Sequence, residues 1–254
     1  MNLSSEIDKN PVFDLIGKAA EKLGVQCFAV GGYVRDILLK RPSKDIDFVC
    51  VGSGIALAQE VSRAMGDLRV TVFKNFGTAR IDWEGFALEF VGARKESYRE
   101  DSRKPLVEDG TLEDDQNRRD FTINALAISV NKATWGELID PFGGIEDIKR
   151  KIIRTPLEPG ITFSDDPLRM LRAVRFASEL NFDIEPGTFE ALTTHALRLK
   201  IVSMERVIDE LNKIILTETP SYGFKLLFHS KLLVEFFPEM VALHGVENID
   251  NKGH

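Results

Sequence analysis

Two carboxylates separated by one residue, Asp45 and Asp47 in KDIDFVCVG, carry the strongest chemical signal in this sequence. Alternate residues of a β-strand point to the same face, so both carboxylates project together while Ile46 and Phe48 face the core. Carboxylates placed in this way repel each other unless a cation lies between them. Mg²⁺ typically takes one or two carboxylates together with substrate phosphates. The pair therefore predicts a magnesium site, whereas a solvated strand edge is the simpler interpretation.

A glycine pair, Gly31 and Gly32, precedes the aspartates at a predicted strand-to-helix junction. Glycines there let backbone N–H groups approach a phosphate, and the N-terminus of the following helix favours negative charge. Arg35 lies on that helix, where it can add a charge-assisted contact to a triphosphate. A glycine pair alone is typical of a tight turn. Combined with the carboxylates on the next strand, it indicates a site for a metal-bound nucleoside triphosphate.

A third carboxylate, Glu89, lies within the apolar segment FALEFVG. Its neighbours Leu88 and Phe90 face the other way, so Glu89 is a candidate to lie beside the aspartate pair on one sheet face. An outward polar position on an amphipathic strand is an equally good explanation. The segment Gly52-Ser53-Gly54 lacks the third glycine of a dinucleotide fingerprint, and the sequence contains no GxxxxGK[ST] motif.

The elements that must position these residues fall into two halves, which together predict an α+β fold. The N-terminal half mixes strands and helices and predicts a mixed β-sheet, while the half from residue 145 onward has helical periodicity almost throughout. Residues 94–118 contain few apolar side chains and are predicted to be a long solvated loop. The expected strands are 27–30, 46–51, 69–74, 78–83, 86–91, 128–130 and 138–139, and the expected helices are 11–26, 34–40, 55–66, 164–180, 186–198, 204–216 and 221–237.

Composition excludes several classes of protein. The chain has 254 residues, 43% of them hydrophobic and 29% charged, and a formal net charge of −7. It contains no apolar run long enough for a membrane span and no secretory signal pattern at its N-terminus. Cys27 and Cys50 are too few for a zinc site or a disulfide framework. We therefore expect a cytoplasmic protein without a membrane or disulfide partner.

Four longer segments are informative as an ordered set, which runs VGGYVRDILLKRPSKDIDFV, RRDFTINALA, IDPFGGIEDIKRKIIRT and DDPLRMLRAVRFA. The set resembles the class II tRNA nucleotidyltransferase (CCA-adding) and bacterial poly(A) polymerase family, within the polymerase-beta nucleotidyltransferase superfamily. The resemblance extends from about Phe28 to about Glu239. It implies a nucleotidyltransferase head, an all-helical neck and the start of a helical body.

The resemblance also implies roles for individual residues. Asp45 and Asp47 match the aspartates that hold Mg²⁺, and Glu89 matches a third catalytic carboxylate. Asp120 and Asn124 fall where the family handles the ribose and shapes the site. The residues expected to bind the nucleotide, counting the glycine pair, are Gly31, Gly32, Arg35, Arg119, Asp120, Asn124, Asp166, Arg169, Arg172 and Arg175.

Within the predicted helix 164–180, Asp166 and Arg169 are three residues apart and are expected to share one face. By resemblance they match the pair that reads the incoming base. A carboxylate accepts from an exocyclic amine and a guanidinium donates to ring acceptors, which suits cytosine and adenine. The simpler explanation is a solvated helix with Ser164 as its N-cap, acids in its first turn and an ion pair between Asp166 and Arg169. The family usually has Glu where this sequence has Asp165.

The resemblance implies three parts, a head over 1–144, a neck over 145–216 and the beginning of a body over 217–254. Relatives are commonly longer, so we expect the chain to be truncated. The leading hypothesis is template-free addition of CCA to the tRNA 3′ end from CTP and ATP, by a two-Mg²⁺ mechanism that releases pyrophosphate, with Mg²⁺ as the cofactor. The alternatives are a poly(A) polymerase, a CC- or A-adding enzyme, a nucleotide-binding regulatory module without turnover, and a metal-binding α/β domain with structural arginines.

Overall fold

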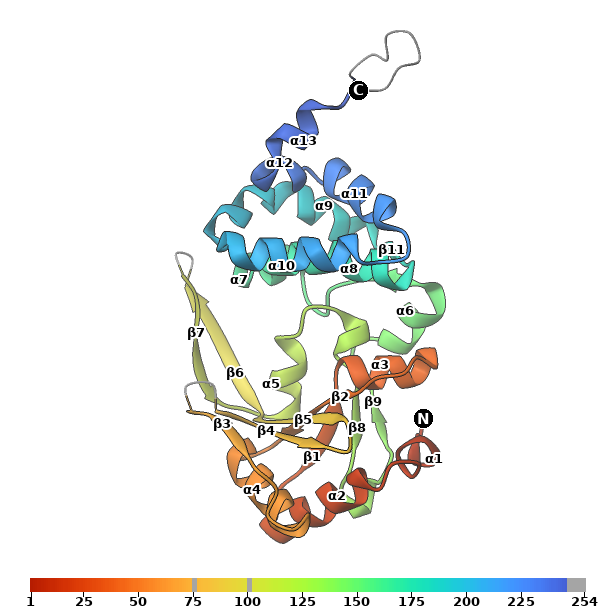
Figure 1. Ribbon diagram of the computed structural model, residues 1–254, viewed down its shortest axis with the longest axis vertical. Helices are drawn as coiled ribbons and strands as arrows, with labels where there is room; N and C mark the ends of the chain where they lie inside the picture. Colours follow the sequence, from red (N-terminus) through yellow and green to blue (C-terminus); the bar gives the residue numbers. More distant parts are fainter. Residues whose placement is uncertain (75–76, 100–101, 246–254) are drawn as a thin grey trace. The chain divides into compact units, whose positions relative to one another are not determined.

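A computed structural model describes residues 1–74, 77–99 and 102–245 (Figure 1). The chain divides into two compact units, one of residues 1–150 with 154–157 and one of 151–153 with 158 onward. The first unit combines strands and helices, and the second is largely helical, in agreement with the predicted α+β class.

The first unit is built on a seven-stranded sheet with the order β3-β4-β5-β2-β1-β8-β9. β2 and β5 are parallel, and the other neighbouring strands are antiparallel, so the sheet is mixed as predicted. Its strands are β1 (Cys27–Val30), β2 (Asp45–Cys50), β3 (Thr71–Phe73), β4 (Thr78–Trp83), β5 (Phe86–Gly92), β8 (Ala127–Ser129) and β9 (Leu138–Ile139). Its helical elements are α1 (Ser4–Ile7), α2 (Val12–Leu23), α3 (Gly32–Leu39), α4 (Gly54–Ala64), α5 (Leu112–Asn117), η2 (Thr122–Asn124), η3 (Lys132–Thr134) and α6 (Gly144–Arg150).

One face of the sheet carries the aromatic core of this unit, and α2 and α4 cover that face (Figure 1). A smaller apolar cluster lies on the other face and contains Phe28, Val30, Val49, Ala93 and Ala127. Phe48 of β2 packs between Phe13 of α2 and Phe90 of β5, with ring centroids 5.7 and 5.5 Å away. All three rings are fully buried. Ile46 is buried beside them, so the alternation expected for the DIDF segment is confirmed.

The prediction of a long loop over 94–118 is wrong. Strands β6 (Arg94–Arg99) and β7 (Ser102–Asp109) form an antiparallel pair, and helix α5 follows. Thr111 and Asp114 form a capping box at the start of α5, in which each side chain bonds the other residue's backbone N–H. The charged residues of this segment show no hydrophobic period. The two strands are held by backbone hydrogen bonds between them, which a hydrophobicity pattern does not detect.

The second unit contains a series of helices and one short parallel strand pair, β10 (Ile152–Ile153) with β11 (Asp183–Ile184). Two predicted helices are each broken in two. The helix expected over 164–180 is interrupted at Asp166 and Pro167, and the helix expected over 221–237 is interrupted at 230–232. The helical elements are α7 (Pro159–Asp165), α8 (Leu168–Leu180), α9 (Pro186–His195), η4 (Ala196–Ile201), α10 (Met204–Ile215), α11 (Pro220–His229), α12 (Leu233–Phe236) and α13 (Pro238–Ala242).

The fold bears on the two cysteines and on the length of the helices. Cys27 and Cys50 are both buried and both free, and they lie opposite each other on β1 and β2. In the described ranges, no helix combines the length and the apolar character that crossing a bilayer requires.

The aromatic packing on β2 generates a prediction for stability. Replacing Phe48→Ala removes the central ring of a fully buried stack, so the free energy of unfolding should fall by about 3–5 kcal/mol. Phe73→Ala is the matched control, because Phe73 is 45% exposed and on the edge strand β3. Its effect should stay below about 1 kcal/mol. Urea unfolding followed by circular dichroism measures both values, and equal losses would contradict this account of the core.

Candidate nucleotide site

The face of the sheet opposite the aromatic core carries the acidic residues. Along β2, Asp45 is exposed and Asp47 half-buried, while the intervening Ile46 and the following Phe48 are buried. Asp45 and Asp47 therefore share one face of the strand and Ile46 and Phe48 the other, as the alternation predicted, and Val49 on the aspartate face is buried as well. Glu89 of β5 is exposed between buried Leu88 and Phe90, which places it on the same face.

The register of the strands aligns these groups in one row across the sheet. Asp47 lies opposite Glu89 in the parallel β2–β5 pair, Glu89 lies opposite Arg80 in β4, and Asp47 lies opposite Val30 in β1. Directly opposed residues on one face have neighbouring side chains. The predicted proximity of Glu89 to the aspartate pair therefore agrees with the register. Arg80, at the end of the row, is a residue that our sequence reasoning missed.

The electrostatic environment of Asp47 is that of a partly desolvated carboxylate among other acids. Burial raises the pKa of Asp47, the guanidinium of Arg119 opposes this effect, and the charges of Glu89 and Asp45 raise the pKa further. Excess negative charge of this kind suits a divalent cation with hard oxygen ligands. Asp45 and Asp47 are the residues that fit such an ion.

A cation at this point needs further ligands from elsewhere. Within the residues described, no group of three His, Cys, Asp or Glu side chains converges closely enough to hold a metal ion. Two carboxylates completed by the phosphates of a bound nucleotide are the usual arrangement for Mg²⁺. The donor set therefore fits a metal that arrives with its nucleotide.

The glycine pair lies beside the carboxylate row. Gly31 has a φ of +74°, and a Cβ added to it would lie 2.9 Å from Nη1 of Arg119 and 3.8 Å from Oδ2 of Asp47. Glycine is required here by its backbone angle and by this close approach. Helix α3 starts at Gly32, and no side chain caps its N-terminus. Its first N–H groups therefore suit an anion next to Asp47.

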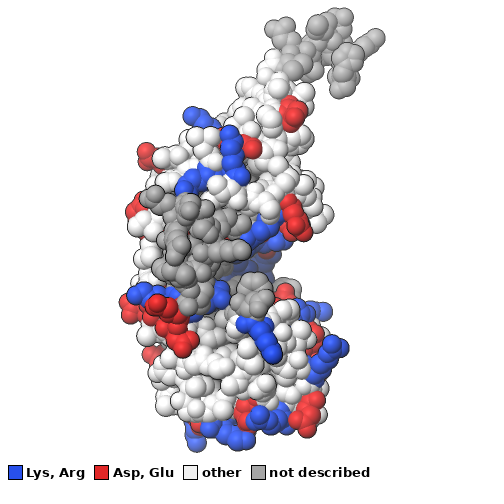
Figure 2. Space-filling model, turned by 90° about the vertical axis from the view of Figure 1, so that its left-hand side faces the viewer, with Lys and Arg blue, Asp and Glu red and all other residues white. Residues whose placement is uncertain are grey.

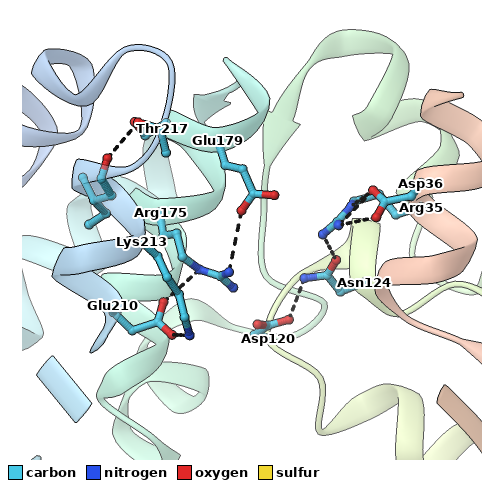
Figure 3. A network of polar contacts seen from close by, with 11 residues as sticks. Arg35, Asp36, Asp120, Asn124, Arg175, Glu179, Glu210, Lys213 and Thr217 are labelled. Atoms are coloured by element: carbon cyan, nitrogen blue, oxygen red, sulfur yellow. Dashed lines mark hydrogen bonds and ion pairs between the residues drawn. The ribbon is translucent and has the colours of Figure 1, made fainter. Parts of the chain in front are cut away.

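Arg35 lies on α3 inside a buried polar network (Figure 3). Its guanidinium donates to both carboxylate oxygens of Asp36 and, over 2.9 Å, to Oδ1 of Asn124. The amide of Asn124 donates in turn to Oδ1 of Asp120 over 3.1 Å. The structure thus brings together Arg35, Asp120 and Asn124, three residues predicted for the nucleotide site. Asp36, which orients Arg35, was missed, although it is the adjacent residue.

Arg119 is held by Asp115, a residue in the segment that was predicted to be a loop. The fully buried side chain of Asp115 in α5 accepts from Nη2 and Nε of Arg119 over 2.8 and 3.0 Å, and it also pairs with Arg118. Burial alone would raise the pKa of Asp115, but the two guanidiniums outweigh burial and hold that pKa below its usual value. The spacing of three and four residues is typical of helical ion pairs, and it would have identified Asp115 if 112–117 had been assigned as a helix.

The start of α8 differs from the prediction. Asp166 has an extended backbone between α7 and α8, so it does not lie in the first turn of a helix that contains Arg169. The physical reason is Pro167, because a residue before proline is driven out of the helical region. The carboxylate of Asp166 accepts from the Leu168 N–H over 3.1 Å and so caps α8. Ser164 lies within α7 and is not an N-cap.

Further along α8, Arg175 takes part in helix packing (Figure 3). Its Nε lies 2.8 Å from Oε2 of Glu210 in α10, a carboxylate that is almost fully buried, and its guanidinium stacks on the ring of Phe176. Glu210 also binds Lys213, and Glu179 lies 3.6 Å from Arg175. This geometry favours the structural interpretation of Arg175. Arg172 contacts the same Phe176 ring from 5.3 Å.

The predicted site residues thus form two groups. The first unit holds the carboxylates with the glycine pair, Arg35, Arg119, Asp120 and Asn124, and the second holds the residues of the α7–α8 segment. On the face shown in Figure 2, basic and acidic side chains are interspersed around wide uncharged areas.

The buried ion pairs of Asp115 generate a second prediction. Asp115→Asn leaves two guanidiniums without their carboxylate, so the free energy of unfolding at pH 7 should fall by about 3 kcal/mol. Because the folded pKa is lowered, this stabilisation is present above the unfolded value of about 4 and disappears as the pH falls through the folded value. The difference between wild type and variant in urea unfolding should shrink below about pH 4. Glu113→Gln, an exposed change on the same helix, is the control, and a pH-independent difference would contradict the ionic explanation.

Comparison with known proteins agrees with the geometry. Residues 27–154 match the family described as "Poly A polymerase head domain", and residues 181–243 match "Probable RNA and SrmB- binding site of polymerase A". An A-adding tRNA nucleotidyltransferase of Aquifex aeolicus is 47% identical over 178 residues, which are 70% of this chain and 21% of that protein. A CCA-adding enzyme of Anoxybacillus flavithermus is 38% identical over 221 residues, 86% of this chain and 53% of that protein.

A solved tRNA nucleotidyltransferase, in complex with a primer tRNA and an incoming ATP analogue, superimposes with a TM-score of 0.77 at 39% identity, over 87% of this chain and 62% of that one. The chain spans about half or less of the length of the two curated relatives. The matched head-domain region contains the carboxylate row, the glycine pair and the Asp115–Arg119 pair. The chain therefore belongs to the tRNA nucleotidyltransferase and poly(A) polymerase family.

Proposed function

We propose that the protein extends RNA 3′ ends, adding CCA to tRNA from CTP and ATP without a nucleic-acid template. The observation that supports this proposal most directly is the row that aligns Asp47 with Glu89, with Asp45 on the same face and Gly31 and Arg119 at one end. The proposed reaction needs a binding place for a nucleoside triphosphate, for a metal ion and for an attacking hydroxyl, and this arrangement offers all three. Buried free cysteines fit a reducing cytoplasmic setting.

In the proposed reaction the 3′-hydroxyl of the RNA attacks the α-phosphorus of the nucleotide, a new P–O bond forms and pyrophosphate leaves. When bound, Mg²⁺ would stabilise the charge that develops on the attacking and leaving oxygens. Asp45 and Asp47 would hold it, and Glu89 would accept the proton that the attacking hydroxyl gives up. Catalysis of this type rests on positioning and electrostatics.

The triphosphate is proposed to lie against the glycine pair and the N-terminus of α3. Arg119 is oriented by Asp115 and suits a charge-assisted contact to a phosphate. Arg35 is buried and bonded to Asn124, so we propose that it shapes the floor of the site together with Asp120. In this proposal the acids next to each arginine fix its direction before a nucleotide binds.

Base selection is proposed for Asp166 and Arg169 in the second unit. Asp166 presents a carboxylate, which accepts from an exocyclic amine, and Arg169 follows in the first turn of α8. Arg172 is retained as a contact on the same helix, whereas Arg175 is proposed to hold α8 against α10. We keep the division into a head over 1–144, a neck over 145–216 and a partial body over 217–254 as part of this proposal.

The named relatives favour two specificities, because one adds A alone and another adds CCA. A single assay separates these from poly(A) synthesis and from a regulatory module. The protein is incubated with tRNAs that end before the first C, after the second C or after the A, and with each nucleotide separately. Product lengths then give CCA addition, A addition, poly(A) extension or no turnover, and no turnover would overturn the proposal.

The carboxylate row generates a prediction for activity. Asp47→Asn keeps the side-chain shape but removes the charge that suits a cation, so kcat should fall by about a hundredfold to a thousandfold. Asp14→Asn, an exposed change on α2 with a side chain 59% exposed, should leave kcat unchanged. Single-turnover incorporation of labelled CMP or AMP into tRNA measures both variants. Near wild-type turnover by Asp47→Asn would remove this carboxylate from the mechanism.

The cap made by Asp166 allows a sharper test of base selection than removal of the side chain. Asp166→Ser retains an oxygen able to cap Leu168 but is too short to reach a base, so stability should be preserved while discrimination against UTP and GTP falls. One hydrogen bond to a charged group contributes about 1.5–3 kcal/mol, or about one to two orders of magnitude in selectivity. The control is Asp209→Asn, an exposed change on α10. Unchanged preference ratios would show that Asp166 serves only as a cap.

A further inference from the structure

Arg80 is the basic residue at the far end of the carboxylate row. It lies opposite Glu89 in the β4–β5 register, and its Nη1 is 3.8 Å from Oε1 of Glu89. The same guanidinium donates to Asp82 over 2.7 and 2.9 Å. Among the described strands β2 to β5, Arg80 is the only residue with a cationic side chain. It is therefore the one positive charge that this part of the sheet contributes to its acidic face.

The order of groups along the row assigns the two substrates to opposite ends. Gly31, Arg119 and the N-terminus of α3 lie at the Asp47 end, where the triphosphate is proposed to bind. In phosphoryl transfer the attacking and leaving oxygens are roughly in line on opposite sides of the phosphorus. Pyrophosphate leaves toward the glycine pair, so the hydroxyl and the RNA strand behind it approach from the β5–β4 side. This step rests on the proposed function.

We propose that Arg80 binds a backbone phosphate of the RNA primer next to its 3′ end and thereby places the hydroxyl beside Glu89. A guanidinium is suited to a phosphate because it can donate two parallel hydrogen bonds. An RNA strand that enters beside three acidic side chains needs such a cation, since its own phosphates are repelled by them. Arg80 supplies that charge one strand away from the third carboxylate.

The present partners of Arg80 leave it competent for this role. The Arg80 side chain is 40% exposed and that of Asp82 is 71% exposed. Ion pairs in such positions contribute about 0–1 kcal/mol, so a phosphate can replace Asp82 without a large loss. Glu89, at 3.8 Å, lies farther from the guanidinium than Asp82 does. The two acids hold the guanidinium over the acidic face before RNA arrives.

The test uses Arg80→Gln, Arg80→Lys and the control Arg63→Gln. Arg63 is 62% exposed and pairs with Glu60 on α4, the helix that covers the opposite face of the sheet. For each protein, the KM for a tRNA acceptor and for CTP, and the kcat, are measured in the transfer assay. Binding of the same RNA is followed by fluorescence anisotropy between low and moderate salt.

We expect Arg80→Gln to raise the KM for RNA about fivefold to tenfold and to leave the KM for CTP unchanged. The slope of log affinity against log salt should fall by about 0.7, the contribution of one phosphate contact on a single strand. Arg80→Lys should keep the slope and restore part of the KM, because it retains the charge, and Arg63→Gln should match wild type.

Each other outcome has one meaning. An active wild type with unchanged RNA affinity and salt slope in Arg80→Gln would overturn the role of Arg80 and leave the proposed function intact. A fall in kcat alone would overturn it too, since Arg80 would then act only on Glu89. A raised KM for CTP would assign Arg80 to the nucleotide. A wild type that transfers no nucleotide would overturn the proposed function itself, and with it this inference.

Discussion

The repulsion between Asp47 and Glu89, which lie opposite each other on β2 and β5, is the constraint that the charged groups around the carboxylate row offset. Two carboxylates directly opposed on neighbouring strands destabilise a sheet, and burial of Asp47 adds to that cost. The protein keeps cations at both ends of the row, Arg119 beside Asp47 and Arg80 beside Glu89. Each cation has its own acid, Asp115 or Asp82, which holds it in place. The acidic face thus has a surplus of negative charge bounded by fixed positive charge.

A sheet can carry such a surplus because apolar packing on the same strands stabilises it. The residues that alternate with Asp45, Asp47 and Glu89 are large and buried, and they pack under α2 and α4. The stacked rings of Phe48 and Phe90 lie on the same two strands as the repelling acids. Repulsion between carboxylates persists where the packing around them fixes the strands firmly. Here the determination comes from the backs of the same strands.

The second unit uses charge differently. Arg175 and Glu210 are buried partners that hold α8 and α10 together, and their value lies in packing. Asp166 stands at the break between α7 and α8, where its carboxylate stays near the surface of the helix start. The segment from Asp166 to Arg175 therefore begins with a carboxylate at a break between two helices and continues with an arginine that packs one helix against another. Sequence spacing alone does not distinguish Arg169, Arg172 and Arg175 from one another.

Local pattern determined a large part of this protein. The alternation in DIDFV and FALEF, the glycine pair before α3 and the helical second half all depend on neighbours within a few positions, which the sequence displays directly. Tertiary structure decided the rest. The opposition of Asp47 to Glu89 and Arg80 depends on strand register between segments far apart in the chain, and the helix that carries Asp115 and the ribbon before it are stabilised by backbone hydrogen bonds and charges that leave no hydrophobic period. Pro167 determines the backbone of its neighbour Asp166, but the sequence did not show that α7 ends and α8 begins at this point. Periodicity tells which face a side chain takes, and only the packed chain tells what stands opposite it.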